Sequence, residues 1–332
     1  MKRCSVTLAM AIFAGLLVAA VSAVQAKPPV TTSWYVYVTD DETGQTLYDW
    51  AYGMGYKAGR KDLSLPGAQY SLIVLDFGQP SKRGAVYGTW SFSKKYGRFV
   101  STTVIKNAVK MFARGYASGS DTESFVTIAV GTNNYGPHAT YAHGEAWAQM
   151  VMDIESWARA TPGIKSAVSV NGASDIEVDY SSPQVARSWV NGFMSSNYRN
   201  GYSISLYNYG DAAGCPQRGT TRIPGNCNNG WTQQDVLDVS PIALPQIYAT
   251  SGANARQWQQ IALYHILRYG SDPEIWGTLS QRRACAQRGG CSGTDNTPSQ
   301  AWSQLWDSLN SNKKTMWMRD NMTFSTDIKW RK

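Results

Sequence analysis

Residues 71–76 read Ser-Leu-Ile-Val-Leu-Asp, four apolar side chains in a row that end on an acid. A short, continuous apolar run is typical of a strand buried on both faces, because a half-exposed strand alternates apolar with polar residues. Residues 125–130, Phe-Val-Thr-Ile-Ala-Val, have the same character. Both runs predict strands of a parallel sheet that helices cover on the outside.

Outward from these two runs, the chain alternates strand-like runs with segments of helical periodicity. Seven or eight such units favour a closed (β/α)8 barrel of the TIM type, with an open doubly wound sheet as the alternative. The other strands are predicted at Trp34–Val38, from Ser166 to about Val178, and at Tyr202–Tyr207, Val236–Ser240, Leu244–Tyr248 and, as the last strand, Glu274–Leu279. The helices are predicted at Leu47–Ala58, Thr102–Tyr116, His143–Arg159, from Pro183 onward, and at Asn254–Tyr269 and Ser299–Leu309.

The amino-terminal segment has the layout of a secretory signal: a basic start, an apolar run from Val6 to Val24, then small residues. We expect cleavage after Ala26, with a cut after Ala23 as the second choice. A retained membrane anchor is the alternative, because the apolar run approaches the length that spans a bilayer. Cleavage would give a secreted protein in which residues 27–332 form one barrel domain, free of the membrane.

Four cysteines follow the predicted signal: Cys215, Cys227, Cys285 and Cys291. An even number in an exported chain predicts two disulfides, for which three pairings exist. Pairing of nearest neighbours would close two short loops rich in Gly, Asn, Arg and Pro. No Cys-x-x-Cys pair occurs and the histidines lack zinc-ligand spacing, so we expect two disulfide-stapled loops and no metal.

Composition narrows the range of partners. The net charge is +8, and the chain contains 13 Trp and 19 Tyr. A positive charge favours residence near anionic polymers, but no Lys/Arg run forms a nucleic-acid patch, so nucleic acid is not an expected partner. Aromatic side chains provide surfaces on which sugar rings stack, which favours a polysaccharide or another glycan. No dinucleotide or P-loop motif is present, and no cofactor is expected.

Residues 173–180, Ala-Ser-Asp-Ile-Glu-Val-Asp-Tyr, carry the main chemical signal. If this segment is extended, Asp175, Glu177 and Asp179 lie on one side, since strand side chains repeat every two residues. Adjacent acids repel one another and raise the pKa of at least one of them, which is how a carboxyl group remains a proton donor near neutral pH. We predict Glu177 as the donor and Asp175 as its orienting partner. Solvated acids or a calcium site are the alternatives.

Other polar residues follow predicted strands, where a parallel barrel places its site. Asp76 ends an apolar run and needs a partner, a ligand or water, and we predict it as a third catalytic carboxylate. The alternative is an acid that caps a loop. The residues predicted to contact substrate, by hydrogen bonding or by stacking, are Asp179, Asn133, Tyr207, Asp211, Gln246, Tyr248 and Trp276.

The run Val-Leu-Asp-Phe-Gly-Gln at residues 74–79 and Asp-Ile-Glu at residues 175–177 resemble secreted bacterial barrels of the glycoside-hydrolase type. The chain is similar to the clan that contains the family 25 lysozymes and the family 18 chitinases. The family 25 pattern of an early-strand Asp and a mid-barrel Asp-x-Glu maps onto Asp76 and onto Asp175 with Glu177. Asp179, directly after that motif, departs from the chitinase pattern. The resemblance implies a TIM-type barrel and carboxylate acid/base chemistry.

Three hypotheses follow. The first is an exported glycoside hydrolase that acts on a cell-wall or environmental polysaccharide, with Glu177 as the acid and Asp175 and Asp76 as its partners. The second is a carbohydrate-binding barrel without catalysis. The third is a structural exported domain whose acids bind calcium.

Overall fold

The computed structural model describes residues 26–38, 44–92, 97–199, 204–219 and 221–331. The predicted signal lies almost wholly outside the described residues, so the signal and its cleavage site stay predictions. Within the described part of the chain, no helix is both long enough and apolar enough to span a bilayer.

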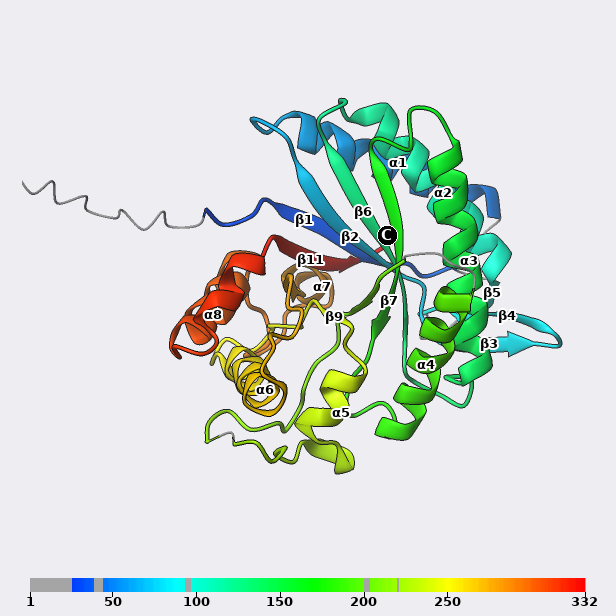
Figure 1. The fold of residues 1–332 in the computed structure, drawn as a ribbon. Helices are drawn as coiled ribbons and strands as arrows, with labels where there is room; N and C mark the ends of the chain where they lie inside the picture. Colours follow the sequence, from blue (N-terminus) through cyan, green and yellow to red (C-terminus); the bar gives the residue numbers. More distant parts are fainter. Residues whose placement is uncertain (1–25, 39–43, 93–96, 200–203, 220, 332) are drawn as a thin grey trace, which may run out of the picture.

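Eight parallel strands form the central sheet and follow one another in chain order around a barrel (Figure 1). The last of them pairs with the first, and bridges at Ala243–Ile275 and Gln246–Leu279 join the two strands that would otherwise be edges. The predicted (β/α)8 barrel is therefore confirmed. The strands are β1 (Val30–Tyr35), β2 (Tyr70–Asp76), β6 (Phe125–Asn133), β7 (Val168–Asp175), β8 (Leu206–Asn208), β9 (Ile242–Ala243), β10 (Gly277–Ser280) and β11 (Phe324–Trp330).

Helices surround this barrel on its outside (Figure 1). They bury a large apolar layer against the outward side chains of the strands, such as Trp34, Ile73 and Val130. A second, smaller cluster, which includes Leu72, Val74 and Ile328, fills the interior of the barrel. The helices are α1 (Gly44–Leu63), α2 (Thr102–Gly119), α3 (Tyr141–Ala160), α4 (Pro183–Arg199), α5 (Gln233–Asp238), α6 (Ala253–Tyr269), α7 (Arg282–Gln287) and α8 (Pro298–Asn310), with the 3-10 turns η1 (Asn228–Gly230) and η2 (Met316–Asn321).

Helices α1 and α2 approach one another closely through glycine. A Cβ atom on Gly55 would run into the Phe112 carbonyl, and one on Gly115 would run into the Tyr52 carbonyl. Gly53, also on α1, has nothing within 4 Å of an added Cβ. Glycine at the facing positions therefore lets the backbones of α1 and α2 pack in direct contact.

One predicted strand is wrong, and one strand of the barrel is absent from the prediction. Residues 236–240 are predicted as a strand, but α5 covers most of them. Thr232 begins that helix with a capping box to Asp235, a local signal that outweighs the apolar run. The strand predicted as the last, Glu274–Leu279, is followed by β11, whose Phe-Ser-Thr-Asp-Ile-Lys-Trp alternates between the two faces of the wall.

The long loop predicted between Gly78 and Phe99 contains structure of its own. An antiparallel sheet of β3 (Gln79–Arg83), β4 (Val86–Trp90) and β5 (Phe99–Ser101) follows β2. Strand β7 is also shorter than predicted and ends at Asp175, so the following acids lie on a loop rather than on an extended strand.

Both predicted disulfides are present and join nearest neighbours, Cys215 to Cys227 and Cys285 to Cys291. The first ties the loop that follows β8, and the second ties the segment that begins with α7. Both segments leave the carboxyl ends of barrel strands. The two staples therefore lie on the face of the barrel where functional sites of this fold are found.

Candidate active site

A cavity of about 250 Å³ opens near the carboxyl ends of the strands. Asp175, the last residue of β7, and Glu177, two residues later, contribute its acids. Aromatic side chains and the α7 segment form the other walls. The lining consists of Tyr35, Phe92, Asp175, Glu177, Tyr180, Tyr248, Gln281, Ala284, Cys285, Arg288, Cys291 and Trp330.

One amide nitrogen joins the two acids. Gln246 Nε2 donates to Asp175 Oδ1 at 2.6 Å and lies 3.3 Å from Glu177 Oε1. Gln246 reaches them from the segment after β9, at the bridge to β10. Because both carboxyl oxygens contact the same nitrogen, the structure brings together three residues that the sequence placed on two separate strands.

The backbone at Glu177 is held on both sides. Asn134 donates through Nδ2 to the Glu177 carbonyl at 3.0 Å and accepts the Glu177 N–H at 3.1 Å. On the opposite side, Gly210 packs so closely on Ile176 that a Cβ atom there would run into the Ile176 carbonyl. Asn134 follows β6 and Gly210 follows β8. The neighbouring strands on both sides therefore fix the loop that carries Glu177.

The acids of this site favour their protonated forms. Burial raises the pKa of Glu177 to about 7, the nearby Asp211 charge adds to this shift, and hydrogen bonds from Gln246 and Tyr180 reduce it. Burial also holds the pKa of Asp175 well above its usual value, and the charges of Glu177, Asp76 and Asp211 raise it further. Burial raises the pKa of Asp211 to about 6. Burial, with repulsion between neighbouring acids added to it, thus makes proton donors of ordinary carboxylates.

Asp76 lies beneath the cavity rather than in its wall. It is fully buried, and burial raises its pKa to about 7 although hydrogen bonding to Gly78 and Tyr209 lowers it. The Gly78 N–H donates to Asp76 Oδ1 at 2.9 Å. The Tyr209 hydroxyl reaches this position because Gly131 has no side chain: a Cβ atom there would run into it. Asp76 therefore influences the cavity through Asp175, whose pKa its charge raises.

Aromatic rings form the wall on the β1–β11 side. Tyr35 stacks on Trp330 with ring centroids 4.5 Å apart, and Phe92 meets both rings edge-on. The Arg288 guanidinium lies 4.0 Å from the Trp330 ring centroid. Such a surface suits the apolar face of a sugar ring, which packs on aromatic side chains while its hydroxyls need polar partners.

The remaining predicted contact residues divide into three groups. Gln246 and Tyr248 lie at the cavity, and Asp211 lies close enough for its charge to act on both Asp175 and Glu177. Asp179 does not line the cavity, and its Oδ1 accepts from Asn229 at 2.9 Å, although its charge adds to the raised pKa of Glu177 and of Asp211. Asn133 is buried and accepts the Tyr135 N–H.

Tyr207 and Trp276 lie deeper or at the far end of the barrel. Tyr207 belongs to the interior cluster and meets Trp276 edge-on at 6.0 Å. Trp276 precedes β10, and its carbonyl accepts the N–H of Phe324, the first residue of β11. Trp276 therefore lies at the amino-terminal ends of these strands, opposite the cavity, and is not part of its lining.

Several residues that contribute to the site are absent from the sequence prediction. Tyr35, Tyr180 and Tyr209 lie on three different segments, and only their position at or just after the ends of parallel strands could have indicated them. Among the described residues, no group of three or more His, Cys, Asp or Glu side chains has an arrangement that could hold a metal ion.

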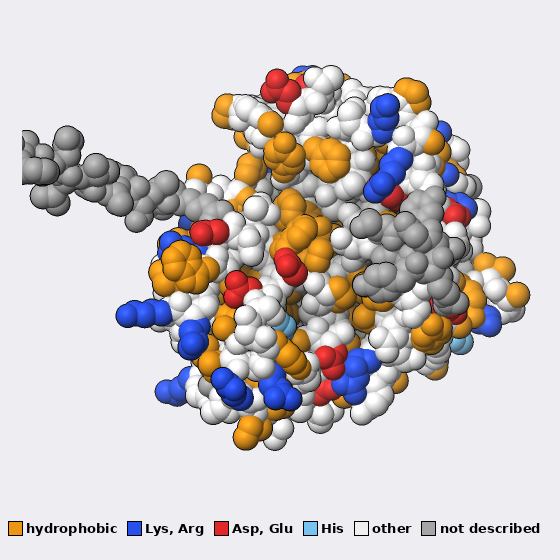
Figure 2. Space-filling model, in the orientation of Figure 1, with side chains coloured by type: hydrophobic (Ala, Val, Ile, Leu, Met, Phe, Trp, Pro, Cys, Tyr) orange, Lys and Arg blue, Asp and Glu red, His pale blue; other side chains and the backbone are white. Residues whose placement is uncertain are grey.

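The face in Figure 2 shows Lys and Arg side chains spread around the rim, with acids both at the edge and nearer the centre. This distribution agrees with the absence of Lys/Arg runs from the sequence.

No family model matches this chain, and no curated protein matches it significantly. Two solved structures resemble it at low similarity. One is a 2,3-dimethylmalate lyase of the PEP mutase/isocitrate lyase superfamily, with 10% identity, 83% of this chain and 80% of that chain covered, and a TM-score of 0.37. The other is the ICChI chitinase from Ipomoea carnea, with 10% identity, coverage of 91% and 93%, and a TM-score of 0.37. Similarity at this level does not establish a common activity.

Proposed function

We propose that this protein is an exported glycoside hydrolase whose proton donor is Glu177. The observation that carries the proposal is the pair of carboxyl groups, Asp175 and Glu177, that share the Gln246 amide inside a cavity at the strand ends. Glycoside hydrolysis needs one carboxyl group that gives a proton and one that carries negative charge. Two acids that interact this closely ionise in separate steps, so one of them keeps its proton when the other has lost it.

How deeply each carboxyl group is buried in the site indicates its catalytic role. Glu177 is the more exposed of the pair and gives its proton to the glycosidic oxygen of the leaving group. Asp175 is buried at the end of β7, and its carboxylate form is favoured as positive charge develops on the sugar ring, which lowers the pKa that burial had raised. A water molecule then adds to the anomeric carbon, and its proton returns to the Glu177 carboxylate. Asp76 is a positioning residue, because it acts on Asp175 from beneath and does not reach the cavity. Tyr35 and Trp330 provide the stacking surface.

Location outside the cell is consistent with the two disulfides, since such bonds persist in oxidising compartments. A polysaccharide of the cell wall or the environment is therefore the substrate class we propose.

The test is release of reducing sugar from a panel of polysaccharides by the wild-type protein and by Glu177→Gln. Loss of the general acid should lower kcat about 10²- to 10⁴-fold, because proton donation contributes that much. Asp179→Asn is the matched control. It removes a neighbouring carboxylate that faces the Asn229 side chain, and its activity should remain within a few-fold of wild type.

The pH profile provides a second measurement. Because the pKa of Glu177 is raised to about 7, activity should fall as the pH rises through 7 and the donor loses its proton. Turnover that is insensitive to Glu177→Gln would rule out this mechanism. Binding of polysaccharide without any turnover would favour the non-catalytic barrel instead.

A further inference from the structure

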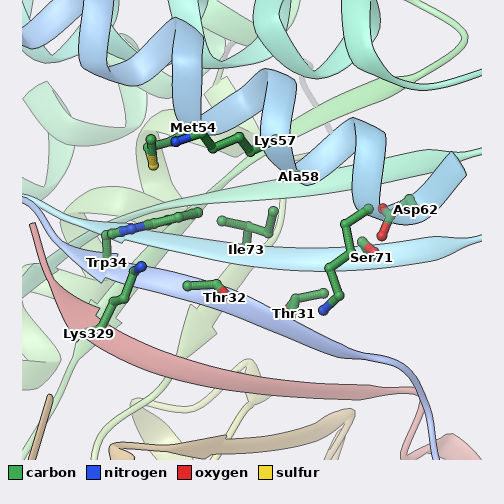
Figure 3. Close-up of a pocket in the computed structure, with 11 residues that line it drawn as sticks. Thr31, Thr32, Trp34, Met54, Lys57, Ala58, Asp62, Ser71, Ile73 and Lys329 are labelled. Carbon is green, nitrogen blue, oxygen red and sulfur yellow. The ribbon is translucent and has the colours of Figure 1, made fainter. Parts of the chain in front are cut away.

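A second cavity lies on the outside of the barrel. The residues that line it differ in chemistry from those of the strand-end site. Its volume is about 210 Å³, and it lies between α1 and the outer face of β1, β2 and β11 (Figure 3). Trp34, Ile73 and Thr32 form its floor, and Met54 and Ala58 of α1 overhang it. We refer to this cavity, lined by Thr31, Thr32, Trp34, Met54, Lys57, Ala58, Lys61, Asp62, Ser71, Ile73 and Lys329, as the lateral groove.

Basic side chains gather around the lateral groove. Lys57 and Lys61 come from α1 and Lys329 from β11, and Figure 3 shows the Lys57 and Lys329 side chains at the Trp34 end. Arg283 of α7 lies close enough that its positive charge lowers the pKa of both Lys61 and Lys329, although burial is the larger cause in each case. Three lysines and one carboxylate, that of Asp62, thus line this small cavity, and Arg283 lies nearby.

The acids nearby are already engaged. Asp62 accepts the Tyr116 hydroxyl at 2.7 Å. Asp327 accepts the Ser280 hydroxyl at 2.8 Å and pairs with Arg283 at 3.4 Å. Lys61 donates to the Val30 carbonyl. Among the residues that the structure describes, no carboxylate lies within ion-pair distance of Lys57 or Lys329. The Lys329 ammonium lies 5.9 Å from the Trp34 ring centroid, so a ligand that covers Trp34 also meets this charge.

The floor between the cations is apolar. The indole of Trp34 and the side chains of Ile73, Met54 and Ala58 make up most of it (Figure 3). The Ser71 hydroxyl lies at the Asp62 end. A fitting ligand therefore needs a negative charge for the Lys57–Lys329 end and a short apolar body to cover Trp34 and Ile73. An inorganic anion would meet only the first requirement, and a neutral apolar molecule only the second.

We propose that the lateral groove binds a short-chain organic carboxylate, with its charge between Lys57 and Lys329 and its chain along Trp34 and Ile73. This site is separate from the glycoside-hydrolase site, so either proposal can fail without the other. The small volume limits the ligand to a short chain rather than a complete membrane lipid.

The experiment is isothermal titration of the full protein with acetate, butanoate, hexanoate and octanoate at constant ionic strength. Each buried methylene is worth roughly a fourfold gain in affinity, so hexanoate should bind more than tenfold tighter than butanoate. The gain should stop once the groove is full. Hexanol, which has the chain without the charge, should bind at least about fivefold more weakly than hexanoate.

Variants locate the site. Lys57→Gln and Lys329→Gln should each weaken hexanoate binding about two- to fivefold, as expected for partly exposed charge pairs. Lys313→Gln, an exposed lysine outside the groove, is the matched control and should change nothing. Ala58→Leu fills the groove from α1 without changing charge and should abolish binding. Melting curves of each variant show whether it remains folded.

Any of four results would overturn the proposal. These are no detectable binding of hexanoate at millimolar concentration, equal binding of acetate and hexanoate, equal binding of hexanol and hexanoate, or full affinity in folded Ala58→Leu.

Discussion

The two cavities of this barrel are nearly equal in size, about 250 Å³ at the strand ends and about 210 Å³ in the lateral groove, yet their charges are opposite. Acids whose pKa is raised gather at the first, and lysines whose pKa is lowered gather at the second. In both places burial is the largest cause of the shift. A group buried without a counter-charge moves toward its neutral form whichever sign it carries.

This difference in charge shows which parts of the fold carry the acids and which carry the lysines. The acids are at or just beyond the carboxyl ends of strands, where side chains from neighbouring strands converge. The lysines project from the outward positions of β11 and from α1, where side chains from distant parts of the chain meet only after packing. The first place suits a reaction that moves a proton, and the second suits capture of an anion.

After Glu177→Gln, Gln246→Ala should have the largest effect, and it would test the strand-end cavity alone. The variant removes the amide that joins Asp175 to Glu177, and loss of a hydrogen bond to a charged group corresponds to about a 10- to 100-fold loss of kcat. Because Gln246 lowers the pKa of Glu177, its removal should move the alkaline limb of the pH–activity profile to higher pH. Hexanoate binding in the lateral groove should be unchanged. An unshifted alkaline limb would contradict the assignment of that limb to Glu177.

Asp76→Asn should change how stability depends on pH. Burial raises the pKa of Asp76 from 3.8 to about 7, so the native state binds its proton more tightly than the unfolded state does. This contribution to stability is complete below about pH 4 and is lost as the pH rises through 7. When the pH falls from 8 to 5, the free energy of unfolding of the wild type should therefore rise by on the order of 2 kcal/mol relative to that of Asp76→Asn. Urea unfolding measures this difference.

His143 contributes to the pH dependence of stability with the opposite sign, because burial lowers its pKa to about 4. Comparing wild type with Asp76→Asn cancels that contribution, since His143 is present in both proteins. Parallel stability curves for the two proteins would show that Asp76 does not titrate in this range.

Gly55→Ala would test the lateral groove alone, and Gly53→Ala on the same helix, with the smallest expected effect, is its control. The methyl group added at Gly55 meets the Phe112 carbonyl and should destabilise the fold by about 1–3 kcal/mol, since overpacked contacts cost this much. It also moves α1, the roof of the lateral groove, so hexanoate affinity should fall while hydrolysis is unchanged. Gly53→Ala on the same helix meets nothing within 4 Å and should stabilise by about 0.5–1 kcal/mol. A thermal melt distinguishes the two variants.

Much of the fold could be predicted from local patterns. Continuous apolar runs such as residues 71–76 become strands buried on both faces, and the helices between them follow from periodicity and caps. Eight barrel strands are predicted and eight form, but only because two errors cancel. Residues 236–240, predicted as a strand, form a helix, and β11 is absent from the prediction. That strand has polar residues at alternate positions because Lys329 and Asp327 face outward beside α1 and α7, where the wall is only partly covered.

The sequence by itself determined which residue types stand at the strand ends, since parallel strands place their carboxyl ends on one face whatever their order. It therefore indicated Asp76, Asp175, Glu177 and Gln246 as residues of that face. Tertiary structure alone decided that Asp76 is covered, that Asp179 turns toward Asn229, and that Trp276 lies at the opposite end. It alone assembled the lateral groove, because Lys57 and Lys329 are separated by most of the chain and meet only when the last strand of the barrel pairs with the first.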